Sequence, residues 1–206
     1  MELGNLSPGL ILTTVVGLAL LPYLAVMVTS FTKLVVVFSL LRNALGLQQT
    51  PPNMVINGLA IILSIYVMYP VGLKMSAVAQ ETGLGRSSDT GSMLHALDQA
   101  KEPLRDFMIR HTAEAERHFF HKTAQRLLDE KEKALISDRD LIVVVPAFTV
   151  SELTAAFQIG FLIFLPFLII DLVVSNILQA MGMMMLSPTT ISMPFKLLLV
   201  VVLDGW

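Results

Sequence analysis

The chain has 206 residues, of which 54% are hydrophobic and 15% are charged, and its formal net charge is −2. A soluble domain carries about 25% charged residues, so the composition indicates a membrane protein and gives no sign of nucleic-acid binding. The sequence contains no cysteine, which excludes disulfides, thiolate metal sites and a cysteine nucleophile.

The charges are concentrated in the middle of the chain, where residues 75–140 hold 22 of the 30 charged side chains. Four runs contain no Asp, Glu, Lys or Arg: residues 3–32, 43–73, 153–170 and 172–195. A membrane-spanning helix needs about 20 apolar residues. We therefore predict an all-α, membrane-associated fold with three parts: an N-terminal hydrophobic hairpin (1–74), a polar helical insert (75–140) and a C-terminal hydrophobic hairpin (141–206).

The N-terminal hairpin is predicted to contain apolar segments over residues 10–41 and 53–73, joined by the turn RNALGLQQTPPN. The first segment is long for one span, and we expect Pro22 and Lys33 to interrupt it. It lacks the basic n-region of a secretory signal peptide, so we expect it to be retained.

The insert is predicted to be helical. Leu104, Phe107 and Met108 recur at helical spacing, and Pro103 is placed as the first residue of a helix. The run AEAERHFFHKTAQRLLDEKEKAL is typical of a solvated helix with one apolar stripe.

The same helix carries a possible metal site, since four side chains share helical spacings: His111, Glu114, His118 and His121. A solvated amphipathic helix explains these residues as well, and we favour it. The sequence has no nucleophile–base motif and no phosphate-binding glycine loop. We therefore predict neither an enzyme nor a bound cofactor or metal.

The C-terminal hairpin is predicted to contain helices over residues 150–179 and 192–206. Thr149 and Glu152 have the spacing of a capping box at the start of the first. Pro194 suits the first turn of the second.

The orientation follows from the rule that short cytoplasmic loops are basic. Lys33, Arg42 and Lys196 fall on one side of a four-segment path, while Glu2, Asp204 and the insert fall on the other. We predict that the insert lies outside the cytoplasm.

Two charged residues interrupt the apolar segments. A carboxylate in hydrocarbon is costly, so Asp171 is either part of an ion path or an inter-subunit contact, or it marks the wet end of a helix. Lys33 is long enough to extend its ammonium to water. A small ion or solute transporter that uses Asp171 and Lys33 is the alternative function for this chain.

The stretch MGMMMLSP contains three consecutive methionines, Met183, Met184 and Met185. Successive helical residues point about 100° apart, so the three cannot share one face. Because Pro188 disfavours helix at the residue before it, they are expected at a helix end or in a loop. Such residues form either a buried turn that fills an irregular gap or a deformable hydrophobic seal.

Two long stretches resemble the FliP/SctR family of bacterial export-gate subunits. One is LIVVVPAFTVSELTAAFQIGFLIFLPFLIIDLVVSNILQAMGMMMLSPTTISMPFKLLLVVVLDGW, and the other is FTKLVVVFSLLRNALGLQQTPPN. Together they cover about half of the chain. Members of this family are non-enzymatic parts of flagella and of type III secretion injectisomes.

The resemblance implies a function that the residues alone do not reach. The chain is expected to form a ring of identical subunits with SctS-type and SctT-type partners in the bacterial inner membrane, its insert periplasmic. The ring surrounds a channel for unfolded exported proteins, and Met183, Met184 and Met185 correspond to the family's methionine gasket. The resemblance also implies that the hydrophobic segments are bent hairpins. Flagellar members commonly carry a cleavable signal peptide, so its expected absence favours the injectisome branch.

Overall fold

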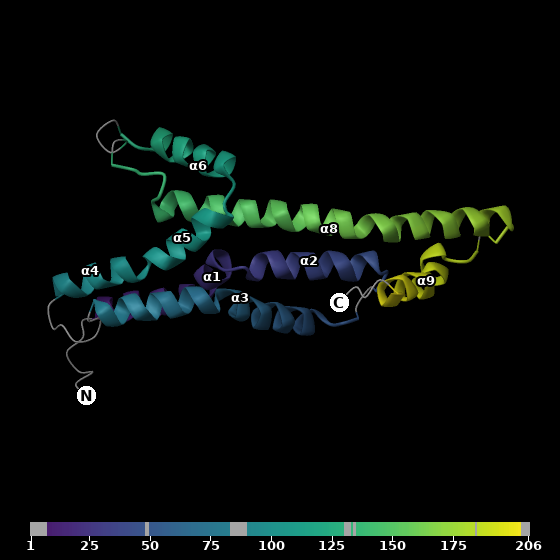
Figure 1. Cartoon of the computed structure of the whole chain (residues 1–206), viewed down its shortest axis with the longest axis horizontal. Coiled ribbons are helices and arrows are strands. Elements are labelled where there is room, and N and C mark those ends of the chain that lie inside the picture. The colour runs from purple at the N-terminus through teal and green to yellow at the C-terminus, as the bar shows by residue number, and fades with distance from the viewer. Residues whose placement is uncertain are drawn as a thin grey trace. The chain divides into compact units, whose positions relative to one another are not determined.

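The computed structural model shows regular structure that is helical throughout the described residues (Figure 1). These are residues 8–47, 50–82, 90–129, 133, 135–183 and 185–202. The helices in chain order are α1 (Pro8–Val28), α2 (Phe31–Ala44), α3 (Asn53–Glu81), α4 (Thr90–Ala100), α5 (Glu102–His111), α6 (Glu114–Leu127), α8 (Leu141–Ala180) and α9 (Pro188–Val202). The predicted all-α class is confirmed for this part of the chain.

The chain forms two compact units. The first combines the segment that ends at Thr32 with Ile65–Glu152. The second combines Lys33–Ser64 with the segment that begins at Leu153. Both α3 and α8 therefore contribute residues to each unit.

Two helices are long and apolar enough to cross a membrane, namely α3 and α8. Within the described residues, α1 and α2 form a third candidate if the pair is one broken span. The described apolar helices therefore agree with the membrane protein that the composition indicates.

The first apolar segment is interrupted at residues 29–30, so the predicted interruption at Pro22 and Lys33 is wrong. Pro22 lies inside α1 and Lys33 lies inside α2. At the break the backbone N–H of Phe31 donates to Thr29 Oγ1 at 3.5 Å. A threonine hydroxyl that bonds nearby backbone groups competes with the helix ladder, which places the break at a polar residue rather than at the proline.

The second apolar segment begins at Asn53 as predicted, but α3 continues to Glu81, beyond the predicted end near residue 73. In the insert, α5 begins at Glu102, one residue before the predicted start at Pro103, and Pro103 lies in its first turn. A proline at this position removes an N–H that has no helical acceptor in any case.

The start of α8 differs from the prediction. The helix begins at Leu141 rather than near Val150, and Thr149 is therefore inside it. The hydroxyl of Thr149 donates to the carbonyl oxygen of Val145 at 2.9 Å, and the side chain of Glu152 is buried. The predicted capping box is wrong because the apolar residues before it are themselves packed as helix.

The start of α9 also differs, since the helix begins at Pro188 and not near Ser192. Pro188 provides the first-turn proline that was assigned to Pro194, and Pro194 lies inside the helix. The backbone N–H of Thr190 donates to the carbonyl oxygen of Ser187 at 3.2 Å, which closes the first turn.

The core of the first unit joins the insert to α8. Met108 of α5 and Val144 and Phe148 of α8 are fully buried and in contact. Leu104 and Phe107 pack against them, and the ring centroids of Phe107 and Phe148 are 5.9 Å apart. The helical spacing predicted for Leu104, Phe107 and Met108 is confirmed in α5, where these residues pack against α8. The apolar stripe was predicted for the following run, and α6 has no buried residue there.

In the second unit, α2 and α8 approach closely at Gly160. A Cβ atom there would overlap Leu40 Cδ1 and would lie 3.1 Å from Leu40 Cβ. We expect Gly160→Ala to lower the free energy of unfolding by about 1–3 kcal/mol through overpacking. Gly58→Ala is the matched control, because a methyl group added to Gly58 would meet nothing within 4 Å, and it should stabilise α3 by about 0.5–1 kcal/mol.

Thermal unfolding of the detergent-purified chain measures both effects. Adding Leu40→Ala should remove most of the cost of Gly160→Ala. Equal stability of the Gly160→Ala and Gly58→Ala proteins would show that the close approach is not required.

Candidate functional site

The chain turns at Gly182 between α8 and α9. Its backbone N–H donates to the Gln179 carbonyl at 3.1 Å, and the N–H of Met183 donates to the Leu178 carbonyl at 2.9 Å. With φ of +73° at Gly182, these bonds form a Schellman motif. The helix therefore ends at a glycine that tolerates left-handed backbone, six residues before Pro188.

We call residues 181–187 the methionine tip. Met181 is 61% exposed, Met183 is 43% exposed and Met185 is fully exposed in the single chain. Met184 lies outside the described residues. The described methionines are therefore not buried in a turn of their own chain, and this apolar surface is available to another molecule.

A group of polar residues, the polar latch, joins three helices below the tip. Lys196 Nζ of α9 donates to Asp171 Oδ2 of α8 at 2.7 Å and to the Ala44 carbonyl oxygen of α2 at 2.9 Å. Ser192 Oγ donates to the other carboxylate oxygen of Asp171 at 2.5 Å. Because Ser192 and Lys196 are four residues apart, both lie on the same face of α9.

The polar latch is largely removed from solvent. Lys196 is 2% exposed and Ser192 is fully buried, while the side chain of Asp171 is 25% exposed. Ala44 is the last residue of α2, where the helix dipole places partial negative charge. The buried ammonium is therefore stabilised by a full negative charge and by the carbonyl end of a helix.

The polar latch connects α8 and α9 at positions removed from the methionine tip. Asp171 lies nine residues before the end of α8, about 14 Å along the helix axis. Lys196 lies eight residues after the start of α9. The ion pair therefore joins α8 and α9 at a point removed from the methionine tip.

The other predicted site residues lie elsewhere. Asp171 forms its ion pair with Lys196. Lys33 is a half-buried residue of α2. His111 Nδ1 donates to the Phe107 carbonyl oxygen at 2.8 Å, since that oxygen can only accept.

His121 belongs to the possible metal site of the sequence analysis. Its Nε2 lies 3.2 Å from the carbonyl oxygen of Ile136. Over the described ranges, no three His, Cys, Asp or Glu side chains are grouped as a metal site would require.

Sequence reasoning missed the role of Lys196, which it used only as a basic charge that sets the orientation. Lys196 is instead buried against Asp171. A signal was present, because these are opposite charges that flank one charge-free run, residues 172–195. Ser192, one helical turn before Lys196, was not distinguishable from an ordinary first-turn serine.

The polar latch predicts a large cost when one charge is removed. Lys196→Met leaves the carboxylate of Asp171 partly buried without its cation, and we expect the free energy of unfolding to fall by about 3–5 kcal/mol. The double variant Asp171→Leu with Lys196→Met should recover most of this loss, because it leaves no charge uncompensated.

The control is Lys101→Met, which removes an exposed pair with Asp98 at 3.9 Å and should cost less than about 1 kcal/mol. Thermal unfolding in detergent measures the series. A Lys196→Met protein as stable as the Lys101→Met protein would contradict the role of the polar latch.

Comparison with known proteins identifies the family. The model of the FliP family matches residues 12–206. The hypersensitivity response secretion protein HrcR of Ralstonia nicotianae is 48% identical over 98% of this chain and 94% of its own. The Yop proteins translocation protein R of Yersinia pestis is 53% identical over 92% of this chain and 87% of its own. The flagellar biosynthetic protein FliP of Bacillus subtilis is 43% identical over 96% and 85%. This chain belongs to the FliP family.

Proposed function

We propose that this chain is a structural and pore-forming subunit of a type III secretion export apparatus, in which it lines part of the channel for unfolded proteins. Its family and its relatives are components of protein secretion and of flagellar biosynthesis. The injectisome branch is favoured, because the two named secretion relatives are 48% and 53% identical, whereas the flagellar FliP proteins of Pectobacterium carotovorum and Bacillus subtilis are 46% and 43% identical.

The observation that carries the proposal is the exposed methionine tip on a hairpin held by the polar latch. Met185 is fully exposed although it is apolar, and an apolar constriction blocks ions by excluding water. Unbranched thioether side chains adapt to irregular shapes. Met183, Met184 and Met185 from several copies would therefore close a pore and still yield to a passing polypeptide.

Assembly into a ring is proposed from the exposed apolar surface. Large hydrophobic side chains are exposed along α1, α3, α8 and α9, and exposed apolar patches mark protein or membrane contacts. We propose that identical subunits, together with SctS-type and SctT-type partners, cover much of this surface. The ring would lie in the bacterial inner membrane with the insert on the periplasmic side.

The alternative of an ion or solute carrier is not favoured by the geometry. Both carboxylate oxygens of Asp171 are engaged within the chain, by Ser192 and by Lys196. A carrier site needs polar groups that can bind a substrate, whereas the carboxylate of Asp171 is already bound by side chains of its own chain. The family relatives are components of export systems, which fits a non-enzymatic role.

The gasket is tested by replacing Met183, Met184 and Met185 with alanine. Shorter side chains should open the constriction, so cells that express the complete export apparatus should leak ions and small solutes while the apparatus still assembles. The triple leucine variant should retain most of the seal, because its side chains have similar volume, but it should slow substrate export. Conductance or small-solute uptake is the measurement.

The matched control is Met54→Ala, which shortens an exposed methionine of α3 and should cause no leak. If the triple alanine variant assembles and is no leakier than the wild type, the methionines are packing residues and the gasket proposal fails.

The orientation is tested with single cysteines, which the natural chain lacks. Lys122→Cys places a thiol on exposed α6 of the insert, and Thr50→Cys places one in the exposed segment before α3. A membrane-impermeant maleimide should label Lys122→Cys in intact cells, whereas Thr50→Cys should need permeabilised cells. The reverse pattern would place the insert in the cytoplasm.

A further inference from the structure

A groove of about 470 Å³ lies between α3 and α5 in the first unit. Its apolar surface is formed mainly by Val67, Val71 and Val78 of α3 and by Phe107 of α5. Lys74 of α3 and Arg110 of α5 line the same groove, together with two carboxylates of α5. The groove therefore combines an apolar floor with charged groups from both helices.

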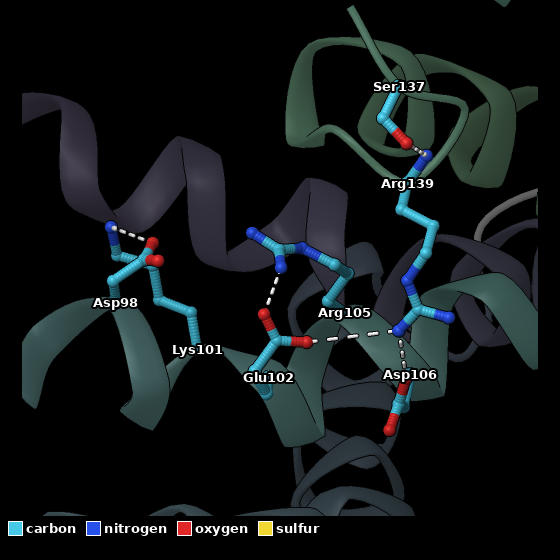
Figure 2. Close-up of polar contacts among 7 residues, drawn as sticks. All are labelled: Asp98, Lys101, Glu102, Arg105, Asp106, Ser137 and Arg139. Carbon is cyan, nitrogen blue, oxygen red and sulfur yellow. Dashed lines mark hydrogen bonds and ion pairs between the residues drawn. The ribbon is translucent and has the colours of Figure 1, made fainter. Parts of the chain in front are cut away.

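The two carboxylates are already engaged by arginines outside the groove lining (Figure 2). Glu102 is paired with Arg105, and Arg139 Nη2 lies 2.9 Å from Asp106 Oδ1 and 3.8 Å from Glu102 Oε2. Charge-assisted pairs of this kind satisfy much of the acceptor capacity of a carboxylate. The negative charge of the groove is therefore neutralised by side chains that belong to the protein.

The two cations of the groove differ from its carboxylates in this respect. Among the ion pairs of the described residues none includes Lys74 or Arg110, and both residues are exposed. The groove thus presents two available positive charges beside an apolar surface. This combination is complementary to a ligand with an anionic end and an apolar end.

The position of the groove along α3 indicates which ligand this is. The charge-free run of residues 43–73 ends at Lys74, and α3 is long and apolar enough to cross a membrane. Val67 and Val71 precede Lys74 by about two turns and one turn. The apolar floor therefore leads into the hydrophobic part of α3, and the cations lie where basic residues meet lipid headgroups.

We propose that this groove binds an anionic phospholipid, with its phosphate between Lys74 and Arg110 and an acyl chain along Val67 and Val71. The proposal rests on the membrane location of the chain and is independent of the channel function. The bound lipid would cover apolar surface of α3 and would link it to α5 of the insert.

The test uses the full-length chain in a neutral detergent with phosphatidylglycerol and phosphatidylcholine of identical acyl chains. Native mass spectrometry measures the lipid that remains bound. The wild type should retain phosphatidylglycerol in preference to phosphatidylcholine. The variant Lys74→Gln with Arg110→Gln should bind phosphatidylglycerol about 30-fold more weakly, since each cation near a membrane surface contributes about fivefold in affinity.

The matched control is Lys122→Gln with Arg126→Gln, which makes the same change of net charge on exposed residues of α6 outside the groove and should bind like the wild type. Val67→Glu, at a position that is 42% exposed, should also prevent binding while keeping both cations. Circular dichroism and thermal unfolding establish that each variant is folded.

Three results would overturn the proposal. The first is equal binding by the groove variant and the control, which would indicate unspecific attraction to charge. The second is equal retention of the two lipids by the wild type. The third is competition by soluble glycerophosphoglycerol with the same affinity as the intact lipid. This result would show that the groove is a site for free phosphate esters instead of a lipid.

Discussion

The arrangement of the second unit depends on the need to neutralise one buried ammonium group. An unpaired charge in a protein interior costs far more than a fold can tolerate, so Lys196 requires acceptors wherever α9 packs. It finds them in the carboxylate of Asp171 and in the last carbonyl of α2. Because these groups come from three helices, the packing of α2, α8 and α9 is tied to a single electrostatic requirement. Such a pair adds little net stability, but it makes alternative packings of the same apolar helices unfavourable.

A second contact fixes α2 against α8 by shape rather than by charge. The side chain of Leu40 packs directly against Gly160 on the surface of α8. Leu40 lies four residues before Ala44, whose carbonyl oxygen accepts a hydrogen bond from the ammonium of Lys196. Apolar helices in lipid have no hydrophobic reason to choose one neighbour over another, so close approach at small residues and hydrogen bonds determine their association. The two contacts together define both the distance and the direction of α2 along α8.

The sequence was sufficient to predict the helical class, the apolar segments and the shared face of Leu104, Phe107 and Met108, because these follow from charge distribution and helical period. It was insufficient for helix boundaries, since the start of α8 depends on packing of Val144 and Phe148 against Met108. The capping-box spacing at Thr149 did not mark the start of α8, because that packing extends the helix back to Leu141. The ion pair of Lys196 was missed because its partners are 25 and 152 residues away along the chain. Local patterns do not encode such distances.

In the turn between α8 and α9, the residues that end and begin the helices differ from those that form the exposed apolar surface of the methionine tip. Gly182 ends one helix through backbone hydrogen bonds, and Pro188 begins the next. Ser187 also takes part in the second boundary, since its Oγ lies 2.8 Å from Thr189 Oγ1. The apolar side chains of Met183, Met185 and Leu186 lie outside these hydrogen bonds. Substitutions at Met183, Met185 and Leu186 can therefore change the size and polarity of this exposed surface while the backbone hydrogen bonds at Gly182 and the start of α9 stay as they are.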